Sequence, residues 1–327
     1  MTRSNHFSRR QMLQGIGLGA ALIGANHLSG LQASGTHAQS TESLLPTIGF
    51  FRFTLGNFHI TAIPDGSRTF DLSTFSANTQ QDAVEDFLTA SRQSIPVPST
   101  FNVLLLEAEE RKILIDTGFG RLPNDPDANI GKLITTLPLL GISPDEITDV
   151  ILTHFHPDHI GGVSFEGVSA YQNARIYFPQ GEFEFLQGSA PIQQLALFFN
   201  LAQAKLEPLV QNDQLTIYNP EDEIVAGIQA IAAPGHTPGH VALLINSEGQ
   251  TLLHLVDSVV HHIMHFSNPE WVMTFDLDPQ QTIETRKNLL ARAADEELQV
   301  IGYHMPFPGV GYVVRKGSAF EYIPAII

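Results

Sequence analysis

The sequence predicts a single α/β domain in which two packed β-sheets are flanked by helices. Short apolar runs of strand length recur along the chain, and segments with apolar residues at helical spacing lie between them. Strands and helices also follow one another in a similar order in the two halves. The chain has 327 residues, of which 43% are hydrophobic, so it can fill a substantial core. Two packed sheets with helices outside are the simplest architecture for that order.

The first half contains patterns for two β-hairpins, two helices and two further strands. Residues 50–66 alternate around Leu55-Gly56-Asn57, as a hairpin does, and the runs TFNVLLLEA and RKILIDTG form a second pair. Ala83, Phe87 and Leu88 lie at helical spacing in an amphipathic segment at residues 79–92. The remaining patterns are buried strands at 149–154 and 174–179 and a helix around 192–202.

The second half repeats this theme with strands, a hairpin and one long helix. GIQAIAAPG has the pattern of a strand, and HVALLINSEGQTLLHLVD has that of a hairpin that turns at Ser247-Glu248-Gly249. A long helix is expected near 279–296, followed by the strand LQVIGYH. Each of these runs ends close to a histidine, an aspartate or a glycine-rich turn.

Charge and cysteine content exclude several classes of function. The formal charge is −17, from 34 acidic and 17 basic residues, and its field repels the phosphate backbone of nucleic acids. A solvated acidic surface is the simplest interpretation of the excess. The chain has no cysteine, so disulfides and thiolate ligands are excluded and a metal site must use nitrogen and oxygen donors.

Residues 1–38 are predicted to be an export signal, with residues 39–327 forming the folded domain. The segment has three arginines and no acidic residue, and SRRQML at residues 8–13 resembles the twin-arginine pattern. The apolar run that follows is interrupted by Asn26, His27 and Ser29, which argues against a membrane anchor. We therefore expect a periplasmic or secreted protein without a stable membrane span, exported already folded.

The stretch THFHPDHIGG brings four possible metal ligands into six positions. His154 and His156 are two residues apart, so they project to the same side of an extended segment. Asp158 and His159 follow in a turn that Pro157 starts, and they can face a second point. The arrangement suggests two adjacent metal ions, and a coincidental polar surface loop is the alternative. Four ligands cannot complete two coordination shells, so others must come from elsewhere.

Four further candidates lie where predicted strands meet loops. The loop APGHTPGHV offers His236 and His240, the run LLHLVDS ends on Asp257, and a strand ends on His304. A buried aspartate in an apolar surrounding is costly without a cation, and loops carried by a rigid sheet are the usual place for sites. For His240, Asp257 and His304, a hydrogen-bonded place in the core is the alternative.

The order of these motifs over residues 100–310 resembles that of metallo-β-lactamase-fold hydrolases. The resemblance implies an αββα sandwich of two mixed sheets flanked by helices, with a dinuclear metal centre at one edge. The match looks closest to the exported branch that contains methyl parathion hydrolase and related lactonases, on the basis of FRFTLGNFHITAIPDG and PFPGVGYVVRKGSAFEYIP. The resemblance allocates His154, His156 and His240 to one metal, Asp158, His159 and His304 to the second, and Asp257 to both.

The remaining site residues are expected to act around these ligands. Asp116 is expected to orient a ligand imidazole or cap a turn, and His236 to lie behind the ligands or in a turn. Phe198 or Phe199 could line a pocket for an apolar or aromatic small molecule, although phenylalanines at helical spacing are more often core. Apolar residues of the N-terminal hairpin could mediate a homodimer.

The predicted chemistry is hydrolysis of an ester, a lactone or a phosphotriester by a hydroxide that bridges two metal ions. Zinc is the expected metal, with cobalt, manganese or iron as alternatives, and Asp158 and Asp257 are ligands that also steer the hydroxide. Activity should fall in acid as ligand histidines bind protons. The alternatives are a glyoxalase II-like thioesterase, a β-lactamase, a single-iron sulfur dioxygenase and a non-catalytic metal-binding member of the same fold.

Overall fold

The computed structural model describes residues 49–120, 129–188, 190 and 195–325. The predicted export signal lies outside these residues, and so does the start of the helix predicted around 192–202. Within the described residues, we find no helix that is both long enough and apolar enough to cross a membrane.

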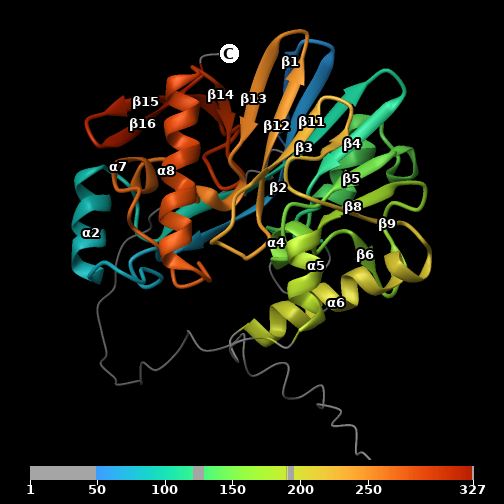
Figure 1. Ribbon diagram of the computed structural model, residues 1–327, viewed down its shortest axis with the longest axis horizontal. Coiled ribbons are helices and arrows are strands. Elements are labelled where there is room, and N and C mark those ends of the chain that lie inside the picture. The colour runs from blue at the N-terminus through green and yellow to red at the C-terminus, as the bar shows by residue number, and fades with distance from the viewer. Residues whose placement is uncertain (1–48, 121–128, 189, 191–194, 326–327) are drawn as a thin grey trace, which may run out of the picture. The chain divides into compact units, whose positions relative to one another are not determined.

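Two mixed seven-stranded sheets form the centre of the fold (Figure 1). In spatial order, the first sheet consists of β1 (Phe51–Leu55), β2 (Phe58–Phe70), β3 (Val97–Ala108), β4 (Arg111–Ile115), β5 (Asp149–Ile151), β8 (Arg175–Pro179) and β9 (Leu215–Tyr218). The second consists of β10 (Glu223–Val225), β11 (Ile228–Ala232), β12 (Val241–Ser247), β13 (Gln250–His254), β14 (Gln299–Ile301), β15 (Val310–Lys316) and β16 (Ala319–Pro324). A separate small ribbon pairs β6 (Ser164–Phe165) with β7 (Val168–Ser169).

Strand pairing confirms the predicted hairpins. β1 pairs with β2 across a turn at Gly56, β3 pairs with β4, and β12 pairs with β13 across Glu248 and Gly249. The first sheet also contains three parallel pairs, β4 with β5, β5 with β8 and β8 with β9, and the second contains one, β13 with β14. The carboxyl ends of parallel neighbours meet at one edge of a sheet, and this brings the loops after β5 and β13 to positions where they can carry a site.

Alternating side chains along the strands create the layers. Leu104 and Leu106 of β3 and Leu243 and Ile245 of β12 share one apolar cluster between the sheets. Their sequence neighbours face outward, where Val103 and Leu105 belong to a second cluster and Ala242 and Leu244 to a third. Because strand side chains alternate, each sheet has two apolar faces and requires a cover on its outer side.

Helices cover these outer faces and complete the predicted αββα sandwich. Residues of α6 (Ala196–Gln211) pack on the first sheet, and residues of α8 (Pro279–Asp295) pack on the second. Figure 1 shows these two helices beside different sets of strands. The other α-helices of the described residues are α2 (Gln81–Ala90), α3 (Leu133–Thr136), α4 (Pro157–Ile160), α5 (Gln180–Gln187) and α7 (Met264–Ser267).

Helix α2 is present as predicted, but it buries a different face. Val84 and Leu88 are its buried residues, whereas Ala83 is exposed and Phe87 is partly buried. Valine removes more apolar surface from water than alanine does, so the helix turns the larger side chain inward. Leu88 belongs to both the predicted and the observed face.

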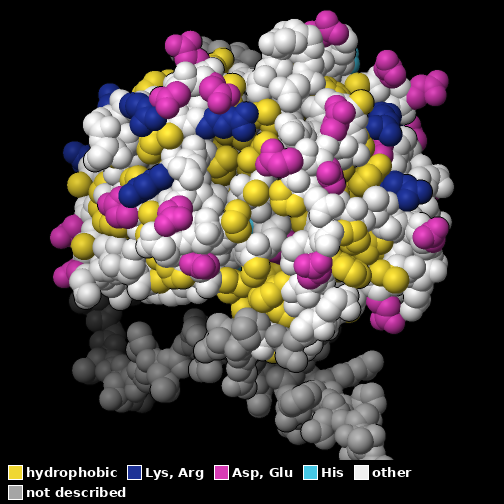
Figure 2. All heavy atoms as spheres, viewed as in Figure 1, with side chains coloured by type: hydrophobic (Ala, Val, Ile, Leu, Met, Phe, Trp, Pro, Cys, Tyr) yellow, Lys and Arg dark blue, Asp and Glu magenta, His cyan; other side chains and the backbone are white. Residues whose placement is uncertain are grey.

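The surface carries acidic and basic side chains side by side. Figure 2 shows acidic side chains dispersed over one face, with basic ones among them and apolar patches between. In the N-terminal hairpin, Phe51 and Phe53 stack with ring centroids 5.9 Å apart and are only partly buried. Dimer formation through this hairpin stays a prediction.

Candidate metal centre

Four loops at strand ends bring nitrogen and oxygen donors together. His154 and His156 follow β5, and His236 lies in the loop between β11 and β12. Asp257 lies in a 3-10 turn after β13, and His304 follows β14. The fold therefore collects at one place residues that are as much as 150 positions apart in the sequence.

The donors form two groups that share one carboxylate. We call His154, His156, His236 and Asp257 the histidine-rich group, and Asp158, His159, Asp257 and His304 the mixed group; within each, the ligand atoms lie within 4.8 Å of one another. In the first, His236 Nε2 is 2.9 Å from His156 Nδ1 and 3.3 Å from Asp257 Oδ2. In the second, Asp257 Oδ1 is 3.3 Å from His159 Nε2, and Asp158 Oδ2 is 3.3 Å from His304 Nε2.

The local sequence explains why neighbouring residues face two points. His156 has an extended backbone (φ −65°, ψ 150°), as expected for a residue before proline. Pro157 then occupies the first position of α4, where its missing N–H costs no helical hydrogen bond. The change from extended to helical backbone turns Asp158 and His159 away from the direction of His154 and His156.

His236, and not His240, carries the ligand atom from the GHTPGH loop. Both nitrogens of His240 are engaged elsewhere, because Nδ1 donates to Ala233 O at 2.9 Å and Nε2 accepts from the Asp257 N–H at 3.2 Å. Burial lowers the pKa of His240 to about 3, so the ring is neutral and can act as this acceptor. The allocation expected from the resemblance is therefore corrected at this position: His240 supports Asp257, and His236 faces the group.

Two buried carboxylates orient ligand imidazoles from behind. Asp116 Oδ2 lies 2.8 Å from His159 Nδ1, and Asp276 Oδ1 lies 2.8 Å from His236 Nδ1. An aspartate that accepts from Nδ1–H leaves the Nε2 lone pair free for a metal ion. Asp116 was among the sequence candidates. Asp276 was not, because an isolated aspartate in the run TFDLDP has no motif around it.

Electrostatics favour positive charge in the space shared by the two groups. Burial lowers the pKa of His154 and of His156 well below the usual value, so both are neutral donors. Burial opposes charge on His159 too, but Asp257, Asp158 and Asp116 outweigh it and raise its pKa well above the usual value. Asp257 is likewise opposed by burial, yet His304 and His159 hold its pKa well below its ordinary range.

The donor set fits a pair of divalent metal ions. His159 Nε2 and Asp257 Oδ1 are buried and have no hydrogen-bond partner, although they lie 3.3 Å apart in the mixed group. Buried polar atoms are normally satisfied, so such a pair indicates a missing partner. Carboxylates, and imidazoles that release their Nε2 proton to a metal ion, are typical zinc ligands, and a carboxylate shared by two groups can bridge two ions.

Aromatic side chains lie against two histidines of the histidine-rich group. Phe198 is edge-on to His156 with ring centroids 5.5 Å apart, and Phe275 is edge-on to His236 at 5.8 Å. Phe75 packs against Phe275 and keeps 37% of its surface exposed. Phe199, the other sequence candidate for the pocket, is only 2% exposed, so its assignment is corrected to core.

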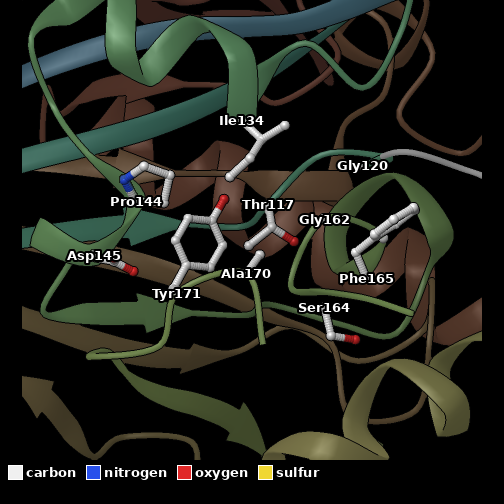
Figure 3. A pocket seen from close by; sticks show the side chains of 11 residues that line it. Thr117, Gly120, Ile134, Pro144, Asp145, Gly162, Ser164, Phe165, Ala170 and Tyr171 are labelled. Carbon is white, nitrogen blue, oxygen red and sulfur yellow. The ribbon is translucent and has the colours of Figure 1, made fainter. Parts of the chain in front are cut away.

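A cavity of about 400 Å³ lies apart from the metal ligands (Figure 3). Thr117, Gly161, Gly162 and Tyr171 are among its lining residues, and none of the seven residues of the two ligand groups lines it. The cavity therefore borders the loops that carry the two ligand groups, but no ligand residue faces it.

Comparison with known proteins connects this geometry to one family. The model of the metallo-beta-lactamase superfamily matches residues 99–304, which include all seven ligand residues. An N-acyl homoserine lactonase of a Bacillus species is 29% identical over 163 residues, which is 44% of this chain and 57% of the relative. A probable metallo-hydrolase of Mycobacterium tuberculosis is 26% identical over 184 residues, or 49% of this chain and 57% of the relative.

Solved structures agree in fold over most of the chain. The dizinc quorum-quenching lactonase AidC, in complex with a product, has a TM-score of 0.80 and 27% identity, covering 85% of this chain and 98% of its own. The hydrolase AbOPH has a TM-score of 0.78 and 25% identity, with the same coverage of 85% and 98%. The chain spans 57% of the length of the first of the curated relatives. The match to the exported methyl parathion hydrolase branch stays a prediction. The family match, the two sheets with their flanking helices and the shared aspartate agree, and the chain belongs to the metallo-beta-lactamase superfamily.

Proposed function

We propose that this protein is a hydrolase with two divalent metal ions that cleaves the ester bond of a lactone or a related carboxylic ester. The observation that carries the proposal is the position of Asp257, which belongs to both ligand groups and has a buried oxygen without a hydrogen-bond partner. The lactonases among the relatives and the neighbouring structures support this choice of substrate class.

The metal ions would be held by the residues of the two groups. His154, His156 and His236 would hold one ion, Asp158, His159 and His304 the other, and Asp257 both. When bound, the two ions would lower the pKa of a water molecule and polarise the carbonyl oxygen of the ester. We propose zinc, because the donors are nitrogen and oxygen atoms and AidC is described as a dizinc lactonase.

The protein groups around the ions would fix orientation and protonation. Asp116 and Asp276 accept from the Nδ1–H groups of His159 and His236, so that each Nε2 would release its proton and present its lone pair to a bound ion. Of the two carboxylates in the mixed group, Asp158 has an exposed side-chain fraction of 16% and Asp257 one of 4%. Asp158 is therefore the carboxylate that solvent and substrate can reach, and it is the better candidate for steering the attacking water.

The aromatic side chains favour a substrate with an apolar substituent. Phe198 and Phe275 flank two ligand histidines, and Phe75 extends this apolar surface to the solvent. An acyl chain or an aryl group placed there would lose its hydration shell, which contributes about 25 cal/mol per Å² of apolar surface removed from water. The lactone or ester carbonyl would then lie beside the ligand groups.

The experiment is a hydrolysis panel with the zinc-loaded protein. The panel contains N-acyl homoserine lactones of increasing chain length, aryl esters, thioesters, β-lactams and phosphotriesters, each tested with wild type and with Asp257→Ala. We expect turnover of lactones and esters that increases with chain length and is lost in the variant. A zinc-loaded wild type that hydrolyses none of these, or only β-lactams, would refute the proposal.

Export is a separate proposal. The twin-arginine pattern near the start of the chain supports folding and metal loading before transport to the periplasm or beyond. Fractionation of cells that produce the full chain, compared with a variant in which Arg9 and Arg10 are both lysine, tests it. We expect the wild type outside the cytoplasm and the variant inside; equal distribution of the two would contradict export by this route.

A further inference from the structure

Glu182 is a fully buried carboxylate that lies between two of the loops carrying metal ligands. It belongs to α5, outside the motifs of the sequence. Its Oε2 accepts a hydrogen bond from Phe155 N at 2.9 Å, and Phe155 separates the ligands His154 and His156. Its Oε1 accepts one from Gly239 N at 2.7 Å, in the loop that carries His236. One side chain thus joins two ligand loops that are about 80 residues apart in the sequence.

Two glycines allow the helix and the loop to approach closely enough for this contact. A Cβ atom on Gly239 would lie 2.2 Å from Glu182 N and 2.4 Å from Gly181 C. A Cβ atom on Gly181 would lie 2.8 Å from the Cα of Gly239. Distances below 3.0 Å are not compatible with a real side chain, so any other residue at position 239 would force the loop away from α5.

Keeping a carboxylate in this position has a cost. Burial raises the pKa of Glu182 to about 7, and a buried carboxylate is unfavourable unless its oxygens are hydrogen-bonded. Glutamine would have a similar shape without this cost, but it offers only one acceptor oxygen. The side chain must accept from two backbone N–H groups at once, and a carboxylate meets that requirement.

We propose that Glu182 is a positioning residue that fixes the distance between the His154–His156 segment and His236, and thereby sets the affinity of the histidine-rich group for its metal ion. The inference rests on the proposed function, because it presupposes a metal ion in this group. The mixed group depends less on Glu182, since Asp116 holds His159 separately and His304 comes from another loop. Loss of Glu182 should therefore affect the two metal sites unequally.

The test is a zinc titration of the metal-free full chain in competition with a chelating dye, for wild type, Glu182→Gln and Glu184→Gln. Glu184 lies on the same helix but is exposed, so it is a matched control. We expect two tight sites in the wild type and the control. In Glu182→Gln, one site should stay unchanged and the other should bind roughly 10- to 100-fold more weakly, the usual effect of removing a group that supports ligands.

Two further variants separate positioning from a general loss of folding. Glu182→Asp keeps the charge but is one methylene shorter, so it cannot reach both amides and should show the same selective weakening. Gly239→Ala leaves the carboxylate in place and displaces the loop, with the same expected result. Unchanged affinities in these variants, or equal weakening of both sites, would overturn the inference. A wild type that binds no zinc would instead overturn the proposed function.

Discussion

Replacing Asp276 by asparagine should weaken metal binding without unfolding the protein. Asp276 accepts from His236 Nδ1 at 2.8 Å through Oδ1 and from Met273 N at 2.8 Å through Oδ2. Asparagine has one acceptor oxygen, and if this oxygen serves Met273, its NH2 group faces His236 Nδ1. The imidazole then has to accept at Nδ1 and keep its proton on Nε2, where the lone pair for the metal ion is needed.

The expected size of this effect follows from the supporting position of Asp276. Loss of a carboxylate behind a metal-binding histidine usually reduces metal affinity by about 10- to 100-fold, which corresponds to about 1.4–2.8 kcal/mol. Zinc affinity is measured by dye competition. The value of kcat/KM is measured separately, on the best substrate of the hydrolysis panel. The control is Asp295→Asn, which removes an exposed carboxylate whose ion-pair partner is Arg315. If Asp276→Asn binds zinc within twofold of wild type, the proposed orientation of His236 is wrong.

Three further predictions concern stability and selectivity. Arg286 is fully buried and donates to backbone oxygens that include Ser258 O at 2.7 Å, so Arg286→Met should cost roughly 3–5 kcal/mol in chemical denaturation; a cost below 1 kcal/mol would contradict this. Phe198→Ala should reduce kcat/KM more for long-chain than for short-chain substrates, by roughly tenfold; equal losses would place Phe198 outside the substrate site. Burial lowers the pKa of Lys205 to about 8, so between pH 8 and 10.5 the unfolded chain keeps the lysine proton and the folded chain does not. The free energy of unfolding, relative to that of Lys205→Met, should therefore rise by about 1–2 kcal/mol from pH 8 to pH 10.5. A flat difference between pH 8 and 10.5 would contradict the assignment.

The layered fold could be predicted because its determinants are local. The alternation of apolar residues in β3 and β12 is visible in the sequence, and the structure places these alternate residues on opposite faces of each sheet. Turn residues such as Gly56 and Gly249 marked the hairpins correctly. The face of α2 was wrong at Ala83 because the packing partner, which the sequence does not reveal, selected Val84.

The metal centre was predictable where spacing and backbone type determine direction. His154 and His156 in an extended segment before proline, and Asp158 and His159 in the following helical turn, give two directions from local rules alone. His236 and His240 are different, because they lie in a loop whose path is set by glycine, proline and tertiary contacts. Spacing could not decide which of the two faces the site.

Residues that act through tertiary contacts could not be found from the sequence. Asp276 and Glu182 are single acidic residues outside any motif, and their importance appears only when distant loops are brought against them. Phe198 and Phe199 are neighbours on α6, so they point in different directions around the helix. Only the packing of α6 shows that Phe198 reaches His156 and Phe199 enters the core.

The metal content of the purified full chain and of two variants tests the central claim most directly. Asp257 belongs to both ligand groups, whereas His304 belongs to one. Elemental analysis should therefore find two divalent ions per chain in the wild type, one in His304→Ala and close to none in Asp257→Ala. A folded wild type that retains no transition metal, or an Asp257→Ala variant that still retains two ions, would contradict the proposed dinuclear centre.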